Sequence, residues 1–245
     1  MQLFRRCNEI VTDKQSVVQK WGKFMEQYIQ DILLNSKLFQ NFDMQMLNSL
    51  MPKLNARIQR YAKQEIIFQE KSKINVVGVI ITGELCAAVM EFDGQENLIQ
   101  KLRSGYTIGA EISCTSTQIS PYALYCVTEA QIFLFPYKVI AEHGWIAEME
   151  RSLLLQNLLE FMAFLNRKQY RRNYVLSTKS ARERIMRYLI EQSRLQGKTQ
   201  FMIPYNREQL ANYLCLNRSV LSHELSLLQQ EGILKFNKNK FWFIK

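Results

Sequence analysis

The 245-residue sequence predicts an α+β fold, because the spacing of its apolar residues changes twice along the chain. Apolar residues recur at helical spacing up to about Leu54, alternate with polar residues between Asn55 and Tyr137, and return to helical spacing from Trp145. Glycine turns separate the short alternating segments, which indicates an antiparallel sandwich or roll. The predicted order is flanking helices, an antiparallel β-roll, a long helix and a small C-terminal helical domain.

Two helices are expected before the sheet. The first spans Ser16 to about Leu34. The second spans Asp43 to Leu54, with Asp43 as N-cap because its side chain accepts hydrogen bonds from first-turn amides. The inner face of the second helix is expected to carry Met46, Leu47, Leu50 and Met51.

Segments of alternating polarity predict the strands of the roll. They span residues 57–61, 64–68, 76–82, 84–92, 97–102, 107–112, 122–127 and 131–135. Turns are expected at Gly83, which needs a positive φ, at Asp93-Gly94 and at Ser104-Gly105. A short helix over Val139–Gly144 follows the last strand.

The longest helix is expected from Trp145 to about Tyr174. Apolar residues at alternating spacings of three and four predict a coiled-coil-like seam and a parallel dimer contact. The seam residues are Leu155, Leu158, Met162, Leu165 and Gln169. A second apolar face of Leu154, Phe161 and Phe164 leaves open that this helix packs on its own β-domain, and both arrangements can hold at once.

A further helix over Ser177–Gly197 is expected to have Ser177 or Thr178 as N-cap and Gly197 as its stop. It leads through residues 200–204 to two helices joined by a tight turn. Asn206 is the expected N-cap of the first of these helices.

The corner between the two helices falls at Cys215, Leu216 and Asn217, and Asn217 can cap the second helix. The apolar face of the second helix carries Val220, Leu221, Leu225 and Leu228. Its N-terminal end carries the short polar or basic residues Arg218, Ser219, Ser222 and His223. A helix that reads base edges in the DNA major groove needs both features. An ordinary antiparallel helix pair is the alternative.

Residues 235–244 alternate apolar and basic side chains around Asn237-Lys238-Asn239, which predicts a basic β-hairpin, or wing. Lysines on such a wing can contact DNA phosphates. The expected phosphate contacts are Asn206, Asn217, Lys235, Lys238 and Lys240. The basic segments 171–172 and 179–187 are weaker candidates, because a solvated helix face explains them equally well.

The charge distribution indicates a nucleic-acid partner. Residues 166–245 hold 16 Lys/Arg and 5 Asp/Glu, a net charge of +11, whereas residues 1–165 hold 16 and 17. A basic protein that is merely soluble would spread its charge along the chain. A basic membrane-surface domain is disfavoured, because no basic amphipathic helix with exposed Trp or Phe is apparent.

Neither a metal site nor a membrane span is expected. The five cysteines include no Cys-x-x-Cys, and the only histidines are His143 and His223. No apolar run approaches the ~18 residues of a membrane span. The N-terminus has no apolar region of signal-peptide type. We therefore expect a soluble, cytoplasmic protein without a cofactor.

The order of roll, long helix, helix-turn-helix and wing resembles the catabolite activator and fumarate–nitrate-reduction (Crp/Fnr) regulator family, over about Leu38 to Ile244. The most specific motifs are Ile80-ITGELCAAV, Phe92-DGQE, Arg103-SGYTIGAE and Arg207-EQLANYLCLNRSVLSHELSLLQQEGIL. The resemblance implies a cyclic-nucleotide-binding-like roll that senses a small effector, and a homodimer formed by the long helix. It also implies contacts with RNA polymerase and a second helix that reads half of a palindromic DNA site. Matched by position, the base-reading residues are Arg218, Ser219, Ser222 and His223, and Cys215 replaces the usual glycine of the turn.

The expected effector pocket departs from the family pattern. Members that bind cyclic nucleotides carry a Gly-Glu pair and then an Arg-Ser pair, but here one residue separates Gly109 from Glu111, and Ser120-Pro121 stands at the second position. No Lys or Arg occurs between Tyr106 and Tyr137, so a cyclic phosphate would lack a cationic partner. We therefore do not expect cAMP or cGMP. The pocket residues for another, unidentified effector are Gly109, Glu111, Ser120 and Tyr122.

Two further sensing modes of the family are disfavoured. The N-terminal cysteine set of its iron–sulfur branch is missing, since only Cys7 lies there, and no histidine precedes His143 to serve as a haem ligand. We expect a sensing domain over 1–144, a dimerisation helix over 145–176 and a DNA-binding domain over 177–245. The leading function is a homodimeric transcription regulator. A regulatory subunit that binds protein instead of DNA is the alternative, and a cupin-like β-barrel enzyme is a remote one.

Overall fold

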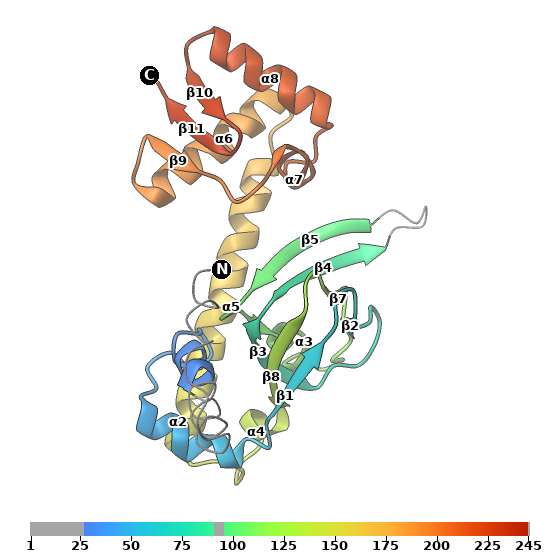
Figure 1. Cartoon of the computed structure of the whole chain (residues 1–245), viewed down its shortest axis with the longest axis vertical. Coiled ribbons are helices and arrows are strands. Elements are labelled where there is room, and N and C mark those ends of the chain that lie inside the picture. The colour runs from blue at the N-terminus through green and yellow to red at the C-terminus, as the bar shows by residue number, and fades with distance from the viewer. Residues whose placement is uncertain (1–26, 91–95, 245) are drawn as a thin grey trace, which may run out of the picture. The chain divides into compact units, whose positions relative to one another are not determined.

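The computed structural model describes residues 27–90 and 96–244 of the chain (Figure 1). The chain divides into two compact units, Met1–Met162 and Ala163–Lys245. The expected Asp93-Gly94 turn and the expected helix before residue 27 lie outside the described residues.

Helices open the described part of the first unit. Residues 27–34 are helical, and α2 spans Met44–Leu50. Asp43 caps α2 as expected, since its side chain accepts a hydrogen bond from the Met46 amide at 2.7 Å. The helix ends before Leu54 because Pro52 has no amide hydrogen to continue it, and residues Met51–Lys53 form a 3₁₀ turn instead.

Two four-stranded antiparallel sheets form the β-roll, which confirms the predicted architecture (Figure 1). One sheet has the order β1 (Arg57–Tyr61), β8 (Ala130–Pro136), β3 (Val76–Thr82) and β6 (Thr107–Ile108). The other has the order β2 (Ile66–Phe68), β7 (Ala123–Cys126), β4 (Glu84–Met90) and β5 (Glu96–Arg103). Side chains from both sheets, such as Ile132 and Leu85, share one buried core.

The turn between β3 and β4 depends on a glycine. Gly83 has a φ of 96°, and a Cβ atom there would lie 2.5 Å from the Glu129 carbonyl oxygen. Any other residue would therefore strain the backbone and clash with the chain before β8. The sequence motif around Gly83 thus reflects a steric requirement.

The prediction of a strand over residues 107–112 was wrong beyond Ile108. Gly109 has a φ of 75°, and a Cβ atom there would lie 2.4 Å from the Val76 carbonyl oxygen. This conformation turns the chain out of β6, and α3 (Ala110–Ser113) follows as a single helical turn. Glu111 therefore lies on a helical turn, and strand alternation does not apply to it.

The long helix α5 spans Glu148–Leu176, after the short helix α4 (Lys138–Ala141). Its buried side chains in the first unit include Leu154, Asn157 and Phe161. The Asn157 amide donates to the carbonyl oxygens of Leu38 and Gln40, at 2.9 and 2.7 Å. One face of α5 therefore packs within its own unit, as the second apolar face of the sequence indicated.

In the second unit, α6 spans Ala181–Gln196 and ends at Gly197 as expected. The expected N-cap was wrong, because Ser180 is the capping residue and accepts from the Glu183 amide. The hydroxyls of Ser177 and Thr178 instead donate to carbonyl oxygens in the last turn of α5. These two residues finish one helix and do not begin the next.

The wing has three strands in the order β10 (Leu234–Asn237), β11 (Lys240–Phe243) and β9 (Gln200–Met202). The sequence predicted the β10–β11 hairpin, and β9 adds a third strand from the segment before the helix-turn-helix. On the free edge of β9, the Gln196 side chain donates to the Met202 carbonyl oxygen at 2.8 Å and accepts from the Met202 amide at 3.4 Å.

Candidate nucleic-acid interface and effector site

The first helix of the helix-turn-helix is α7 (Arg207–Tyr213), and its N-terminus is fixed by a reciprocal cap. The Asn206 side chain accepts from the Gln209 amide at 2.9 Å, and the Gln209 side chain accepts from the Asn206 amide at 3.1 Å. Both amides lack partners within the helix, so this capping box stabilises the helix start. Leu210 and Ala211 then anchor α7 in the core of the unit.

The turn between α7 and α8 runs through Cys215, which is exposed and has a φ of 52°. This left-handed conformation favours glycine, so Cys215 occupies a glycine-type position. Asn217 stands at the N-cap position of α8, but its side chain makes no capping hydrogen bond. Asn217 therefore occupies the expected N-cap position, but the expected capping hydrogen bond is not made.

A Cys215→Gly variant is expected to raise the free energy of unfolding by about 0.5–1 kcal/mol. Relief of left-handed strain outweighs the extra freedom that glycine gives the unfolded chain. Urea denaturation of both proteins measures the change. Cys215→Ala keeps the strain and removes only the thiol, so an equal gain in that variant would contradict the explanation.

The second helix, α8, spans Arg218–Gln230 and is held by one buried face. Leu221, Leu225 and Leu228 are fully buried. Val220 was expected on this face but is 38% exposed, because it lies one residue away from the buried row. On the opposite face, Ser219, His223 and Ser226 follow one another at helical spacing and are exposed.

The four expected base-reading residues lie in the first two turns of α8. Arg218, Ser219, Ser222 and His223 are all exposed. The Ser222 carbonyl oxygen accepts from the Ser226 hydroxyl at 2.9 Å, so Ser226 is turned back along the helix. The N-terminal half of α8 thus presents short polar side chains and one guanidinium to solvent.

Two of the five expected phosphate-binding residues, Asn206 and Lys238, line a cleft of about 490 Å³ between the start of α7 and the turn of the wing. Its lining residues are Pro204, Tyr205, Asn206, Arg207, Gln209, Lys238 and Asn239. The cleft thus brings Asn206 and Lys238 together, and Lys235 and Lys240 lie exposed on the two strands of the hairpin. Asn217 lies apart from this group, at the start of α8.

Sequence reasoning did not single out Arg207 in this cleft. Its guanidinium lies 4.5 Å from the centre of the Phe236 ring and 5.5 Å from that of Phe241. These aromatic faces hold a cation at the first turn of α7, where the helix dipole disfavours positive charge. A basic residue directly after the N-cap Asn206 is unfavourable for the helix, and this feature of the sequence could have marked Arg207 as a candidate functional residue.

Most other arginines of the second unit bind protein groups. Arg171 pairs with Glu191 at 3.3 Å, and Arg182 pairs with Glu231. Arg172 lies 5.3 Å from the centre of the Tyr213 ring. These contacts leave the lysines of the wing as the more available cations.

Arg184 is the most connected of these arginines. Its guanidinium donates to the carbonyl oxygens of Thr178 and Leu214, each at 2.9 Å, and of Cys215 at 3.2 Å. Leu214 is the C-cap of α7, and Cys215 is the first residue of the corner of the helix-turn-helix. Arg184 therefore ties the segment before α6 to the turn that positions α8.

Three of the four expected effector residues lie together in the roll. The Tyr122 hydroxyl donates to Glu111 Oε1, and the Ser120 hydroxyl donates to the Tyr122 carbonyl oxygen at 2.7 Å. Glu111 Oε2 is buried and has no hydrogen-bond partner among the described residues. Gly109 contributes by its backbone turn, which places Glu111 on α3.

Burial raises the pKa of the Glu111 carboxyl, and the hydrogen bond from Tyr122 lowers it less strongly. Burial and the nearby Glu111 carboxylate raise the pKa of Tyr122, so the phenol remains the donor in this pair. A carboxyl oxygen without a partner in this position can accept a hydrogen bond from a ligand.

A Glu111→Gln variant is expected to gain stability over the wild type as pH rises. Because the folded-state pKa is raised, the folded protein holds a proton that the unfolded chain has lost, and wild-type stability falls as pH passes upward through this interval. The stability gained by the variant is about 1.4 kcal/mol for each pH unit between the pKa of Glu111 in the unfolded chain and its pKa in the folded protein. This gain vanishes below the ordinary glutamate pKa. Urea unfolding from pH 4 to pH 7 measures it. A pH-independent difference, or an equal one for exposed Glu129→Gln, would contradict this account.

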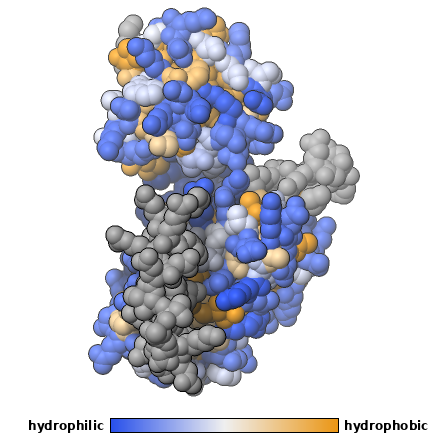
Figure 2. All heavy atoms as spheres, viewed as in Figure 1, coloured by the Kyte–Doolittle hydropathy of each residue, from blue (hydrophilic) through white to orange (hydrophobic). Residues whose placement is uncertain are grey.

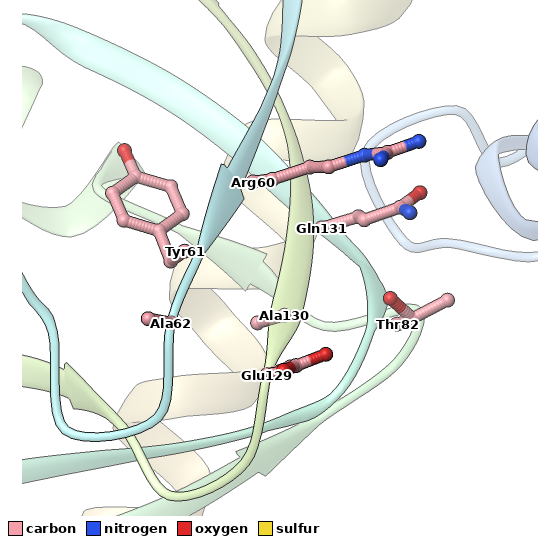
Figure 3. A pocket seen from close by; sticks show the side chains of 7 residues that line it. All are labelled: Arg60, Tyr61, Ala62, Thr82, Glu129, Ala130 and Gln131. Atoms are coloured by element: carbon pink, nitrogen blue, oxygen red, sulfur yellow. The ribbon is translucent and has the colours of Figure 1, made fainter.

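A separate cleft of about 440 Å³ lies on the sheet that contains β1, β8 and β3 (Figure 3). Its lining residues are Arg60, Tyr61, Ala62, Thr82, Glu129, Ala130 and Gln131. Figure 3 shows the side chains of Arg60 and Gln131 extending to the same side, away from Tyr61. None of the expected effector residues lines this cleft, so it is distinct from the Glu111–Tyr122 pair.

The expected dimer residues differ in exposure along α5. Leu158 is only 6% exposed, whereas the adjacent Leu159 is 72% exposed. Leu155, Met162 and Leu165 are half-buried and Gln169 is exposed. The accessible apolar stripe of α5 therefore includes Leu159 in place of the predicted Leu158.

Figure 2 shows a visible surface that is mostly hydrophilic, with small separate apolar patches. Within the described ranges, no helix is both long and apolar enough to cross a membrane. Over residues 27–90 and 96–244, no three His, Cys, Asp or Glu side chains gather where they could hold a metal ion.

Residues 183–245 match the sequence profile of the Crp-like helix-turn-helix domain. The second unit contains a Crp-like helix-turn-helix domain. No curated protein sequence matches the chain. The match and the fold together confirm the resemblance to Crp/Fnr transcription regulators that the sequence motifs indicated.

Solved structures of Crp/Fnr type share the fold of the chain. FixK2 from Bradyrhizobium japonicum has a TM-score of 0.55 and 21% identity, over 78% of this chain and 93% of FixK2. The c-di-GMP-responsive global regulator CLP of Xanthomonas campestris has a TM-score of 0.61 and 15% identity, over 83% of this chain and 100% of CLP. A CooA variant from Carboxydothermus hydrogenoformans has a TM-score of 0.55 and 17% identity, over 84% and 93%. At these identities the likeness establishes the fold alone.

Proposed function

We propose that the protein is a homodimeric transcription regulator that reads a two-fold DNA operator with α8. The observation that carries this proposal is the exposed polar N-terminal half of α8, backed by three fully buried leucines within a Crp-like domain. A major groove admits one α-helix, and base edges lie within reach of its first turns. Arg218, Ser219, Ser222 and His223 are the proposed base-reading residues, and contact with RNA polymerase follows from the family resemblance.

The cleft between α7 and the wing is the proposed site of backbone phosphates. Lys238 and Arg207 both line the cleft and supply positive charge to it, and Lys235 and Lys240 extend that charge along the hairpin. The side-chain oxygen of Asn206 accepts a hydrogen bond in the capping box, so the side-chain NH₂ group of Asn206 is the part available to a phosphate. Such contacts position the domain on DNA without reading sequence.

The proposed dimer seam on α5 uses Leu155, Leu159, Met162, Asn166 and Gln169. These residues alternate at spacings of four and three and are half-buried or exposed in the single chain. Leu159 replaces the predicted Leu158, because Leu158 is already buried, and the exposed Asn166, seven residues after Leu159, then replaces the predicted Leu165. An asparagine within such a seam fixes the register of the two helices.

The proposed effector offers a hydrogen-bond donor to Glu111 and carries no phosphate against it. Support comes from the buried Oε2 atom without a partner and from the absence of Lys and Arg between Tyr106 and Tyr137. A phosphate beside a buried carboxyl would be repelled whenever that carboxyl is charged. An amide, an amine or a hydroxyl group satisfies the free oxygen.

The DNA-binding proposal is tested by fluorescence anisotropy with fragments of the upstream region of the gene, at two salt concentrations. Arg218→Ala is expected to lose roughly 1–3 kcal/mol on the preferred fragment and to relax base preference. Lys238→Ala is expected to weaken binding about equally on all sequences and to reduce the salt dependence. Operator binding that survives both substitutions would overturn the groove assignment. No binding even at low salt would favour a protein-binding subunit.

A further inference from the structure

Val220 is an apolar side chain in a polar surface. It is the third residue of α8, and along this helix, which is described throughout, it is the one large apolar side chain that is exposed. Its neighbours in sequence differ sharply, since Leu221 is fully buried and Ser219 is exposed. Val220 is therefore not part of the buried core that holds α8 in place.

Helix stability does not explain a valine at this position. Valine is a weaker helix former than alanine, arginine or glutamine, because its branched side chain loses rotational freedom. The same stiffness holds its two methyl groups in one direction. An exposed valine in the first turn is thus a fixed apolar contact that projects from the helix.

DNA offers one apolar group on the base edges of the major groove, the C5 methyl of thymine. The residues around Val220 on α8, such as Arg218 and His223, are polar and suit hydrogen bonds to base edges and phosphates. An apolar protein partner is less suited to this polar surface, because it would bury the polar side chains without hydrogen-bond partners. We propose that Val220 contacts a thymine methyl in each half of the operator and so selects thymine at that position, an inference that rests on the proposed function.

The test uses DNA in which single thymines are replaced by deoxyuridine, which removes only the methyl group. A preferred operator is first selected from random DNA with the full-length protein, and each thymine of one half-site is then replaced in turn. At one position, the Kd of the wild type is expected to rise about fourfold, the effect of exposing one methyl-sized group. Changing both half-sites together is expected to give about 15-fold, because distant contacts add.

The variants decide whether Val220 makes this contact. Val220→Ala is expected to bind the thymine operator about fourfold more weakly per half-site and to change less than twofold on deoxyuridine replacement. Ser226→Ala, an exposed substitution later in α8, is expected to keep the wild-type response. The proposal is overturned if no thymine of the half-site responds in the wild type, or if Val220→Ala responds as the wild type does. Selection that yields no preferred sequence would overturn the proposed function as well.

Discussion

A Leu159→Lys variant is expected to be monomeric and to lose roughly 100-fold or more in operator affinity. Leu159 is 72% exposed in the single chain, and in the proposed seam it would face its counterpart in the second copy. A lysine there would place two charges in an apolar contact. Each helix-turn-helix would then bind its half-site alone and lose the gain that comes from linking two sites.

Light scattering of the purified variant measures the association state, and anisotropy with whole and half operators measures the affinity. Glu160→Lys is the matched control, because it introduces the same side chain at the adjacent exposed position of α5. A dimeric Leu159→Lys protein would place the seam elsewhere on the helix. An equal loss of dimer in both variants would indicate a general effect of positive charge.

An Arg184→Met variant is expected to lose about 3 kcal/mol of stability in the second unit. Three carbonyl oxygens would lose a charged donor, and net contributions of such hydrogen bonds are about 1.5–3 kcal/mol each but do not add fully. For a unit of this size, the melting temperature is expected to fall by roughly 15 °C. Because two of these oxygens precede α8, DNA affinity is expected to fall as well.

Calorimetry measures the melting temperature, and hydrogen exchange of residues 207–217 reports whether the turn has loosened. Arg187→Met is the control, since Arg187 lies on the same helix but donates to one carbonyl oxygen, that of Tyr174 at 3.2 Å. Faster exchange confined to Arg184→Met is the expected result. Similar behaviour of the two variants would mean that the three-carbonyl contact has no special role.

Local signals in the sequence predicted the element boundaries well where a single nearby residue can serve as the helix cap or the turn glycine. Asp43 and Asn206 cap their helices, and Gly83 and Gly197 take the positive φ that their positions need. Ser180 was missed because Ser177, Thr178 and Ser180 are all good caps, and the choice depends on where α5 ends. The residue at which α5 ends is determined by tertiary contacts and cannot be read from the local sequence.

Helix faces were predicted less well, because neighbouring apolar residues leave the phase of a helix uncertain. Val220 beside Leu221, and Leu158 beside Leu159, are pairs in which one residue is buried and the other is exposed. The pairing of Glu111 with Tyr122 could be anticipated only as a shared pocket, because it depends on the turn at Gly109 that converts an expected strand into α3. Arg207 was missed because its aromatic partners lie about 30 residues later in the chain.

The hydrogen bonds between Gln196 and Met202 have a consequence for the behaviour of the isolated protein. A free strand edge exposes amide and carbonyl groups that can pair with a strand of another molecule. The Gln196 amide occupies both groups of Met202, and β9 is only three residues long, so little of this edge remains open. This edge of the wing is thereby kept from pairing with a strand of another molecule.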